Sequence, residues 1–424
     1  MKSLYTKLCS SRCLKRAWET LTKSPQSHGI SNETIQTFRD NLTSNLKQIQ
    51  KELKSNSYQF SPLRAVPIHK EKNKVKKIRP IRIAEIRDRV VLKAIANLIT
   101  PQLQKQYKLK NPASFAYQKR IGTRHAIERM VRLFHDGNKV ALEGDIIKFF
   151  DRVDRKYLLY DLIYPILPDD TLNNLIDQGL EIEIGNAEEL TDEEKLEFDR
   201  SEGGIPQGSA LSPLLSNVYL SKFDQGMLNA GYGLVRYADD FLVMCPTENE
   251  AIEAYKLAKL ILEDELHLNI HALDNESKDS KCRIVRPSQK PLEFLSIMFN
   301  GQRLYPAPRK ITELKDKIQH NVNQYNQLTV IEVLTKTKNI LEGWLAAFHY
   351  TDLEPNIKII DDFINTHIGY VLRDLGWKLK DMENKKGKWH FTDTLSELQR
   401  NSSGIPFCRD ILKKYEDSKI KVAK

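Results

Sequence analysis

The stretch Tyr237-Ala238-Asp239-Asp240 lies between two apolar runs, Leu234-Val235 before it and Phe241-Leu242-Val243-Met244 after it. This pattern predicts a β-hairpin with two adjacent carboxylates at its tip. Like charges held at close range raise each other's pKa, so such a pair is costly unless a divalent cation neutralises it. A plain Asp-rich hairpin turn would give the same local pattern, and the four residues alone favour that simpler interpretation.

A third carboxylate belongs to Asp145, which ends another apolar run, Val140-Ala141-Leu142-Glu143-Gly144-Asp145. Between the two runs stands a Gly-rich turn, Gly203-Gly204-Ile205-Pro206-Gln207-Gly208-Ser209. Three converging aspartates can hold two Mg²⁺ ions, which share their other coordination positions with phosphates and water. Such a centre transfers nucleotidyl groups. Taken together, the three acids and the turn disfavour the plain-turn interpretation.

Composition is typical of a soluble globular protein, with 40% hydrophobic and 29% charged residues in 424. The net charge is +10, and six of the ten residues from Lys70 to Arg79 are basic. A basic run of this kind indicates a polyanionic partner, although a solvated loop would also explain it. The five cysteines form no CxxC pair and no zinc spacing, so we expect a reduced, cytoplasmic protein without structural metal. No signal peptide and no apolar run near ~18 residues is visible, so no membrane partner is expected.

The order of these pieces resembles the reverse transcriptases of the bacterial group II intron-like lineage, over most of the chain. A lone Tyr-Ala-Asp-Asp is weak evidence, whereas seven blocks in the family's order are specific. The blocks are the N-terminal helical segment 14–38, Arg79-Pro80-Ile81 with Asp88-Arg89-Val90-Val91, Asp145-Ile146-Ile147-Lys148-Phe149-Phe150-Asp151, the stretch 204–213, Tyr237-Ala238-Asp239-Asp240, Lys281-Cys282-Arg283-Ile284, and Phe294-Leu295-Ser296.

This resemblance implies an α/β (α+β) right-hand polymerase fold with fingers, a ferredoxin-like palm, a helical thumb and a short helical tail. We expect N-terminal helices and fingers at 1–138, palm at 139–303, thumb at 304–375 and a C-terminal extension at 376–424. The spacing of Ile311, Leu314, Ile318 and Val322 predicts an amphipathic thumb helix beginning at Lys310, whose apolar stripe could equally be ordinary core.

Two further segments carry structural expectations. The segment 183–202 holds nine acidic residues against Lys195 and Arg200, and we expect a solvated excursion that its own charge keeps away from nucleic acid. The apolar segment 292–299 is expected to form one strand.

The resemblance assigns the catalytic and metal-binding roles to the three aspartates. Asp145 and Asp239 would ligate two Mg²⁺ ions, with Mn²⁺ as an alternative, and Asp240 would be an additional or outer carboxylate. Deoxynucleoside triphosphates would be the substrates. Phe150 would pack under the incoming sugar and block a 2′-hydroxyl, where related RNA polymerases usually place a polar residue. An ordinary core phenylalanine beside Phe149 is an equally open interpretation.

Other residues would contact nucleotide or nucleic acid. Arg79, and less surely Lys77, would bind the triphosphate, and Lys281 would lie near pyrophosphate unless it forms a surface salt bridge. Gln207 and Gly208 would approach the template and the nascent base pair, beside Ile146. The nucleic-acid contacts would come from Lys70, Lys72 and Lys74 of the basic run and from Lys310 and Lys315 of the thumb helix.

Family membership leaves the biological role open. The resemblance favours a stand-alone, defence-associated enzyme that copies a structured non-coding RNA into cDNA to resist phage. An intron-encoded reverse transcriptase or maturase, or a shortened relative, is the first alternative. A catalytically idle RNA-binding scaffold is the second. The template, the primer and the oligomeric state, including a homo-oligomer, stay open.

Overall fold

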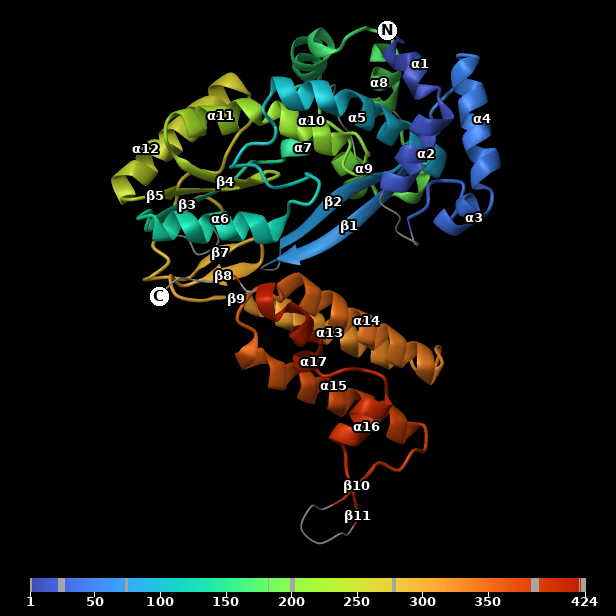
Figure 1. The fold of residues 1–424 in the computed structure, drawn as a ribbon, viewed down its shortest axis with the longest axis vertical. Helices are drawn as coiled ribbons and strands as arrows, with labels where there is room; N and C mark the ends of the chain where they lie inside the picture. Colours follow the sequence, from blue (N-terminus) through green and yellow to red (C-terminus); the bar gives the residue numbers. More distant parts are fainter. Residues whose placement is uncertain are drawn as a thin grey trace. The chain divides into compact units, whose positions relative to one another are not determined.

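The structure of the protein is a computed structural model that describes residues 2–21, 27–72, 75–181, 183–198, 203–276, 280–382, 389–418 and 420. Side chains at 70–72, 75–77, 380–382, 389–391, 417 and 418 lie outside this description. The chain forms two compact units (Figure 1). The first contains Met1–Ala126 and Leu142–Ile284, and the second contains Ile127–Ala141 and Val285–Lys424.

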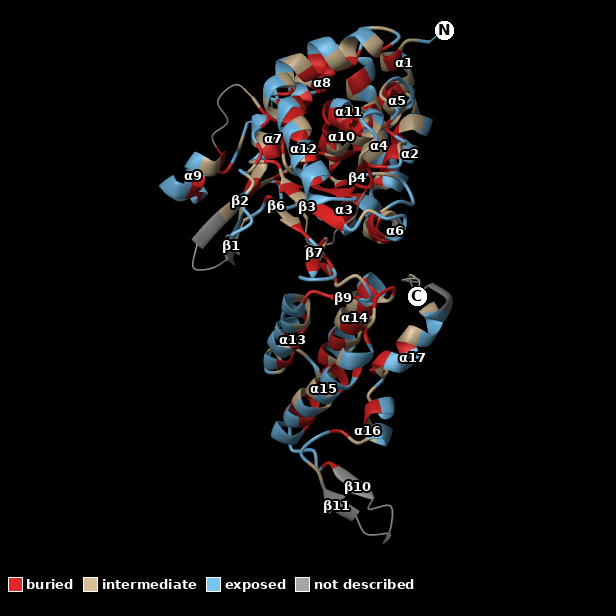
Figure 2. Cartoon of the chain, turned by 90° about the vertical axis from the view of Figure 1, so that its left-hand side faces the viewer, coloured by how far each residue is buried: buried red, intermediate tan, exposed pale blue. Residues whose placement is uncertain are grey.

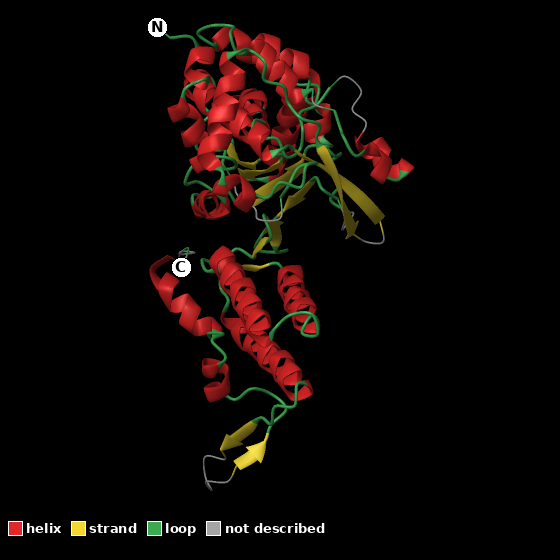
Figure 3. Cartoon of the chain, turned by 90° about the vertical axis from the view of Figure 1, so that its right-hand side faces the viewer, coloured by secondary structure: helices red, strands yellow, loops and turns green. Residues whose placement is uncertain are grey.

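The first unit is mainly helical, and Figure 3 shows its helices gathered on one side of its strands. Its longest helix is α5 (Ile86–Gln106), in which Val90, Val91 and Ile95 are fully buried, as their helical spacing predicts. The other helices are α1 (Leu4–Leu8), α2 (Ser11–Thr20), α3 (Ile35–Asp40), α4 (Leu42–Lys54), α6 (Thr123–His135, which runs into the second unit), α7 (Phe149–Arg152), α8 (Asn173–Leu180), α9 (Asp192–Phe198), α10 (Ser212–Tyr219), α11 (Ser221–Asn229) and α12 (Glu248–Lys259), with shorter turns at Tyr157–Ile163, Tyr164–Ile166, Ala187–Glu189 and Leu260–Glu265.

A four-stranded sheet carries the predicted aspartates. Its strand order is β4 (Gly233–Tyr237), β5 (Asp240–Cys245), β3 (Val140–Asp145) and β6 (Arg283–Val285). β4 and β5 form the predicted antiparallel hairpin, and Tyr237 pairs with Asp240 across a two-residue turn. Because β3 lies next to β5 in the sheet, the end of β3 comes beside that turn. Figure 2 shows the strands as predominantly buried. A one-residue slip would move the apolar side chains of a strand to its other face, so burial of these side chains fixes the register of the strands.

A second pair of strands forms a long hairpin, β1 (Arg64–Lys72) and β2 (Val75–Ile83). The acidic excursion docks on this hairpin, so the expectation that it is simply solvated is wrong. Leu190 and Phe198 of the excursion pack with Ala65 and Ile184 into a small apolar core. The side chain of Asn186 bonds both the N–H and the carbonyl of Ala65, at 2.8 and 3.2 Å. Apolar residues between the acids therefore overcome the charge.

The second unit contains a small antiparallel sheet and a helical bundle. The sheet consists of β7 (Leu292–Phe294), β8 (Ile297–Phe299) and β9 (Leu304–Pro306). In the bundle, Leu314, Ile318 and Val322 are buried, which confirms the predicted amphipathic helix. The bundle and tail elements are α13 (Pro308–Asn323), α14 (Val330–Phe348), α15 (Glu354–Asp374), β10 (Lys380–Met382), β11 (Trp389–Phe391), α16 (Glu397–Ser402), α17 (Cys408–Leu412) and a 3₁₀ turn at Lys413–Ser418.

The prediction of one strand over 292–299 is wrong, because a tight hairpin interrupts it. Leu295 and Ser296 both have left-handed backbone, with φ of 51° and 68°, and connect β7 to β8. Two consecutive positive φ values are typical of a type I′ turn, which can usually be recognised in a sequence by Asn or Gly at these two positions. Neither residue is present here, so the sequence gives no turn signal.

The mixed helix and strand composition confirms the predicted α/β (α+β) class. The four predicted regions, with boundaries at 138, 303 and 375, stay a prediction, since the two compact units divide the chain at other points. Within the part of the chain described above, no helix is both long and apolar enough to cross a membrane.

Candidate active site

The first carboxylate of the site is placed by the close approach of two strands. Gly144, one residue before Asp145, lies so near the Phe241 ring of β5 that any Cβ there would overlap it. Glycine therefore lets β3 run directly beside β5. The carboxylate of Asp145 makes an ion pair with Lys281, and its Oδ2 lies 3.5 Å from Nε2 of His271. Lys281 thus lies beside Asp145 in a salt bridge, and its predicted place near pyrophosphate stays a prediction.

The hairpin carboxylates interact with Asp145 electrostatically. Asp240 is exposed at the tip of the hairpin, but the surrounding protein partly desolvates its carboxylate. This desolvation first, and then the charges of Asp239 and Asp145, raise the pKa of Asp240 to about 7. Burial also raises the pKa of Asp239, and the charge of Asp145 raises it further, whereas Arg79 and Lys281 oppose this. The three predicted aspartates are therefore brought together at the end of one sheet. The three carboxylates together carry more negative charge than the neighbouring Arg79 and Lys281 neutralise.

These residues fit a divalent cation by their chemistry. Three carboxylates supply the hard oxygen ligands that Mg²⁺ prefers. The raised pKa values of Asp239 and Asp240 show that ionising both of them beside Asp145 is costly without additional positive charge. As the side chains stand, no three His, Cys, Asp or Glu residues within the described ranges are grouped closely enough to hold a metal ion.

The Gly-rich turn faces the β1–β2 hairpin, and the contact joins several predicted nucleotide-binding residues. The backbone N–H of Arg82 donates to the carbonyl of Gln207, at 2.9 Å. Arg79 Nε donates to the Gln207 side chain at 3.2 Å, and Arg79 itself is exposed. Gly208 has φ of 110°, and a Cβ there would overlap the carbonyl oxygen of Arg82. Glycine is thus required for this contact.

Two adjacent phenylalanines take different positions. Phe149 is buried, with 1% of its surface exposed, and packs edge-on against Phe150 and Tyr219. Phe150 is only half-buried. Its carbonyl accepts from the N–H of Ile205 at 2.8 Å, which fixes the Gly-rich turn beside it. Phe149 therefore belongs to the core, and a role of the half-buried Phe150 in contacting the incoming sugar stays a prediction.

Other predicted contact residues divide into three groups. Lys70, Lys72, Lys74 and Lys77 fall where side chains are outside the described residues. Ile146 is buried, at 2% exposure, and pairs with Ile270, so only its main chain can reach a nucleotide. In the second unit, Lys310 pairs with Glu313, at 2.7 Å, and Lys315 lies over the Phe363 ring. A role of these two lysines in nucleic-acid binding stays a prediction.

Sequence reasoning missed two residues of the site. Tyr117 has left-handed backbone, with φ of 61°, and is 48% exposed. Partial burial raises its pKa, Asp239 raises it further and Arg79 lowers it, so its hydroxyl lies among these charges. His271, beside Asp145, was also missed. Both stand far along the chain from their partners and within no recognisable motif, so the sequence offered no signal.

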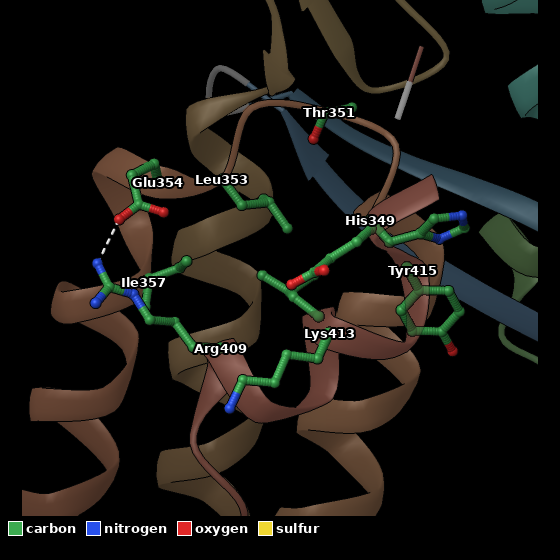
Figure 4. A pocket seen from close by; sticks show the side chains of 10 residues that line it. His349, Thr351, Leu353, Glu354, Ile357, Arg409, Lys413 and Tyr415 are labelled. Atoms are coloured by element: carbon green, nitrogen blue, oxygen red, sulfur yellow. Dashed lines mark hydrogen bonds and ion pairs between the residues drawn. The ribbon is translucent and has the colours of Figure 1, made fainter. Parts of the chain in front are cut away.

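A separate pocket of about 230 Å³ lies in the second unit, among the loop that joins α14 to α15, the first turn of α15, α17 and the segment that follows it (Figure 4). Its two basic side chains are paired, Arg409 with Glu354 and Lys413 with Asp410. His349 and Tyr415 stack with ring centroids 4.4 Å apart. Because its basic groups already have carboxylate partners, we assign it no catalytic role.

Comparison with known families identifies the chain. The sequence profile described as "Reverse transcriptase (RNA-dependent DNA polymerase)" matches residues 68–299, which is more than half of the protein. The chain belongs to the reverse transcriptase family. The matched region contains the three aspartates, the Gly-rich turn and Arg79.

Individual relatives agree with the group II-like lineage. Protein YkfC of Escherichia coli is 26% identical over 211 residues, covering 48% of this chain and 51% of that protein. The group II intron-encoded protein LtrA of Lactococcus lactis is 28% identical over 206 residues, covering 49% of this chain and 31% of LtrA. The matched part thus spans about half of these relatives or less.

Among solved structures, the chain is similar to one chain of a partial Cas6-RT-Cas1–Cas2 complex, with a TM-score of 0.35 and 21% sequence identity. The similarity covers 62% of this chain and 43% of that chain.

Proposed function

We propose that the protein is an RNA-directed DNA polymerase that makes cDNA by two-metal nucleotidyl transfer. The observation that carries the proposal is the meeting of Asp145 with Asp239 and Asp240 at adjacent strand ends, where the charge of Asp145 raises the pKa of both hairpin carboxylates. Family membership supports the same chemistry. An idle scaffold would keep this charge cluster without a use for it, and such a cluster is costly.

The side chains of the site divide the work. Asp145 and Asp239 would hold Mg²⁺, with Asp240 as a further carboxylate. Bound Mg²⁺ would activate the primer 3′-hydroxyl and stabilise the departing pyrophosphate. Arg79 would bind the triphosphate through charge-assisted hydrogen bonds, and its exposure and its hydrogen bond to Gln207 support this role. Lys281, next to Asp145, adds positive charge where pyrophosphate charge would develop.

Primer extension on an RNA template tests this proposal. We expect labelled dNTPs to be incorporated only with Mg²⁺ or Mn²⁺, and D239A/D240A to abolish incorporation. The matched control is D192A/E193A, which removes an equally adjacent but exposed acidic pair on α9. Full activity of D239A/D240A would overturn the proposal, as would equal losses in both double variants.

We further propose that the template is a structured non-coding RNA and that the cDNA serves antiviral defence. The support is the resemblance to stand-alone defence-associated reverse transcriptases, together with a net charge of +10 suited to RNA. Sequencing nucleic acids that co-purify with the protein tests this idea. One short RNA with its cDNA is expected, and phage resistance should disappear in D239A/D240A.

An intron-encoded reverse transcriptase or maturase is the second candidate, favoured by the 28% identity to the group II intron-encoded protein LtrA of Lactococcus lactis. Recovery of ribozyme intron RNA in the same experiment would favour it over the defence role. Resistance that survives in D239A/D240A would instead indicate an RNA-binding scaffold.

A further inference from the structure

The last charged residue before the catalytic hairpin turn is fully buried. Arg236 lies in β4 with 0% of its surface exposed. Its Nε and Nη2 donate to the two carboxylate oxygens of Asp224, each at 2.6 Å. Nη2 also donates to Ser114 Oγ at 2.9 Å, and Nη1 donates to Asn217 Oδ1 at 3.3 Å and to the carbonyl of Ala238 at 3.0 Å. All five N–H groups of the guanidinium therefore have acceptors.

The acceptor in the turn is under backbone strain. Ala238 has φ of 59°, a left-handed value, at the first position of the two-residue turn. Hairpins that need a positive φ there usually place Gly at that position, because a Cβ is disfavoured in this conformation. The Ala238 carbonyl and the Asp239 N–H belong to one peptide group. A hydrogen bond that holds this carbonyl therefore fixes the plane from which Asp239 projects.

We propose that Arg236, held by Asp224, is a positioning residue that keeps the strained Ala238–Asp239 peptide in the orientation that presents Asp239 to the metal. The inference rests on the proposed function, since it assigns Asp239 its role. Arg236 has no access to substrate and acts only through this peptide.

The anchorage of Arg236 is rigid because three separate elements supply it. Asp224 lies on α11 and also accepts from Asn111 Nδ2, at 3.2 Å. Asn217 lies on α10 and donates to the carbonyl of Ala116 at 3.0 Å. The third element is the segment 113–116, which contains Ser114 and Ala116. The backbone N–H of Arg236 donates to the carbonyl of Ala113 at 2.6 Å, and the carbonyl of Arg236 accepts from the N–H of Phe115 at 3.0 Å.

This anchorage also explains why arginine is needed. Lysine carries three donors on a single nitrogen and cannot engage a carboxylate in two-point fashion while reaching a carbonyl on the other side. R236K should therefore keep a positive charge beside Asp224 but lose the hydrogen bond that fixes the Ala238 carbonyl.

The test compares R236M/D224L and R236K with the wild type. Replacing the buried ion pair by apolar side chains of similar size can leave a protein folded. We expect an unchanged circular dichroism spectrum, an unchanged Kd for primed template and a similar KM for dNTP. The kcat for single-nucleotide addition should fall about tenfold, and the Mg²⁺ concentration for half-maximal rate should rise. This factor corresponds to the penalty that left-handed backbone imposes on Ala.

Adding A238G to each background separates positioning from a general structural effect. Glycine holds the left-handed turn without help, so A238G should restore more activity to R236M/D224L than it adds to the wild type. An equal factor in both backgrounds would overturn the inference, as would wild-type kcat and Mg²⁺ dependence in R236M/D224L. If R236M/D224L does not fold, R236K with and without A238G decides by the same criteria.

The outcome is distinguishable from failure of the proposed function. Activity that survives D239A removes the metal role of Asp239 and with it the proposed function. Loss of activity in D239A together with full activity in R236M/D224L removes only the role of Arg236.

Discussion

Selection between deoxyribose and ribose depends on a single side chain in this account. Phe149 and Phe150 are indistinguishable in sequence, and both core and sugar-contact roles were open for Phe150. The structure buries Phe149 and leaves Phe150 half-buried beside the Gly-rich turn. Its partial exposure is compatible with the proposed role of the Phe150 ring in excluding a 2′-hydroxyl.

We expect F150V to raise the use of rNTPs relative to dNTPs by roughly tenfold or more, because removing part of a pocket wall relaxes discrimination on that scale. The measurement is kcat/KM for matched dNTP and rNTP on the same primed RNA template. F149L is the control, and it should lower stability without altering sugar selection. An unchanged ratio in F150V would show that another group excludes the hydroxyl.

The catalytic and metal-binding roles of the three aspartates stay predictions. Their meeting was predictable from the sequence, because paired acids beside apolar strands are unusual without a cation to neutralise them. Arg236, Tyr117 and His271 were not, because their roles depend on partners far along the chain. Asp224 follows a helical pattern and looks like an ordinary surface acid, although it is 1% exposed.

The Gly-rich turn shows how one element depends on another. The contact of Gly208 with Arg82 holds Gln207 against the β1–β2 hairpin, and the positive φ of Gly208 makes that contact possible. Replacing Gly208 should therefore disturb the structure of both the Gly-rich turn and the β1–β2 hairpin where they meet.

G208A should lower polymerase activity at least tenfold and the free energy of unfolding by roughly 1–3 kcal/mol, since a strained backbone and an overlap arise together. G231A is the matched control, because Gly231 also has positive φ, 83°, but has nothing within 4 Å of its would-be Cβ. It should lose about 1–2 kcal/mol of stability and keep its activity. Thermal unfolding and primer extension of both variants provide the comparison. Equal activity losses would contradict the role of the contact.

Elements with strong periodicity were predicted well, whereas those defined by turn geometry, or whose apolar residues stand among many charges, were not. The hairpin of β4 and β5 and the amphipathic α13 follow directly from residue spacing. The β7–β8 hairpin was missed because Leu295 and Ser296 adopt positive φ without Gly or Asn. The excursion was misjudged because its charge concealed Leu190 and Phe198, which bury themselves against β1 and β2.

The chain as a unit is basic, and its predicted partner is a polyanion. A net charge of +10 favours binding that releases condensed counterions. The mixed fold and the family were predictable because the sequence motifs stand in the family's order, whatever the length and sequence of the loops between them. The boundaries at 138, 303 and 375 depend on packing, which the sequence pattern does not report.

The association constant for primed RNA template should fall steeply as salt increases, with a log–log slope of about −5 if some six phosphates of the duplex are contacted. Fluorescence anisotropy from low to moderate NaCl concentrations measures this slope. D239A/D240A should give a similar slope, because removing two acids leaves the phosphate contacts in place. Binding that is insensitive to salt would contradict an electrostatic partner surface.

The central claim is that Asp145 and Asp239 hold a divalent ion between adjacent strand ends. Anomalous diffraction from crystals of the protein with primed RNA template, dNTP and Mn²⁺ measures this directly. We predict anomalous peaks about 2 Å from carboxylate oxygens of both residues. Bound primer and nucleotide with no peak within reach of either carboxylate would contradict the account.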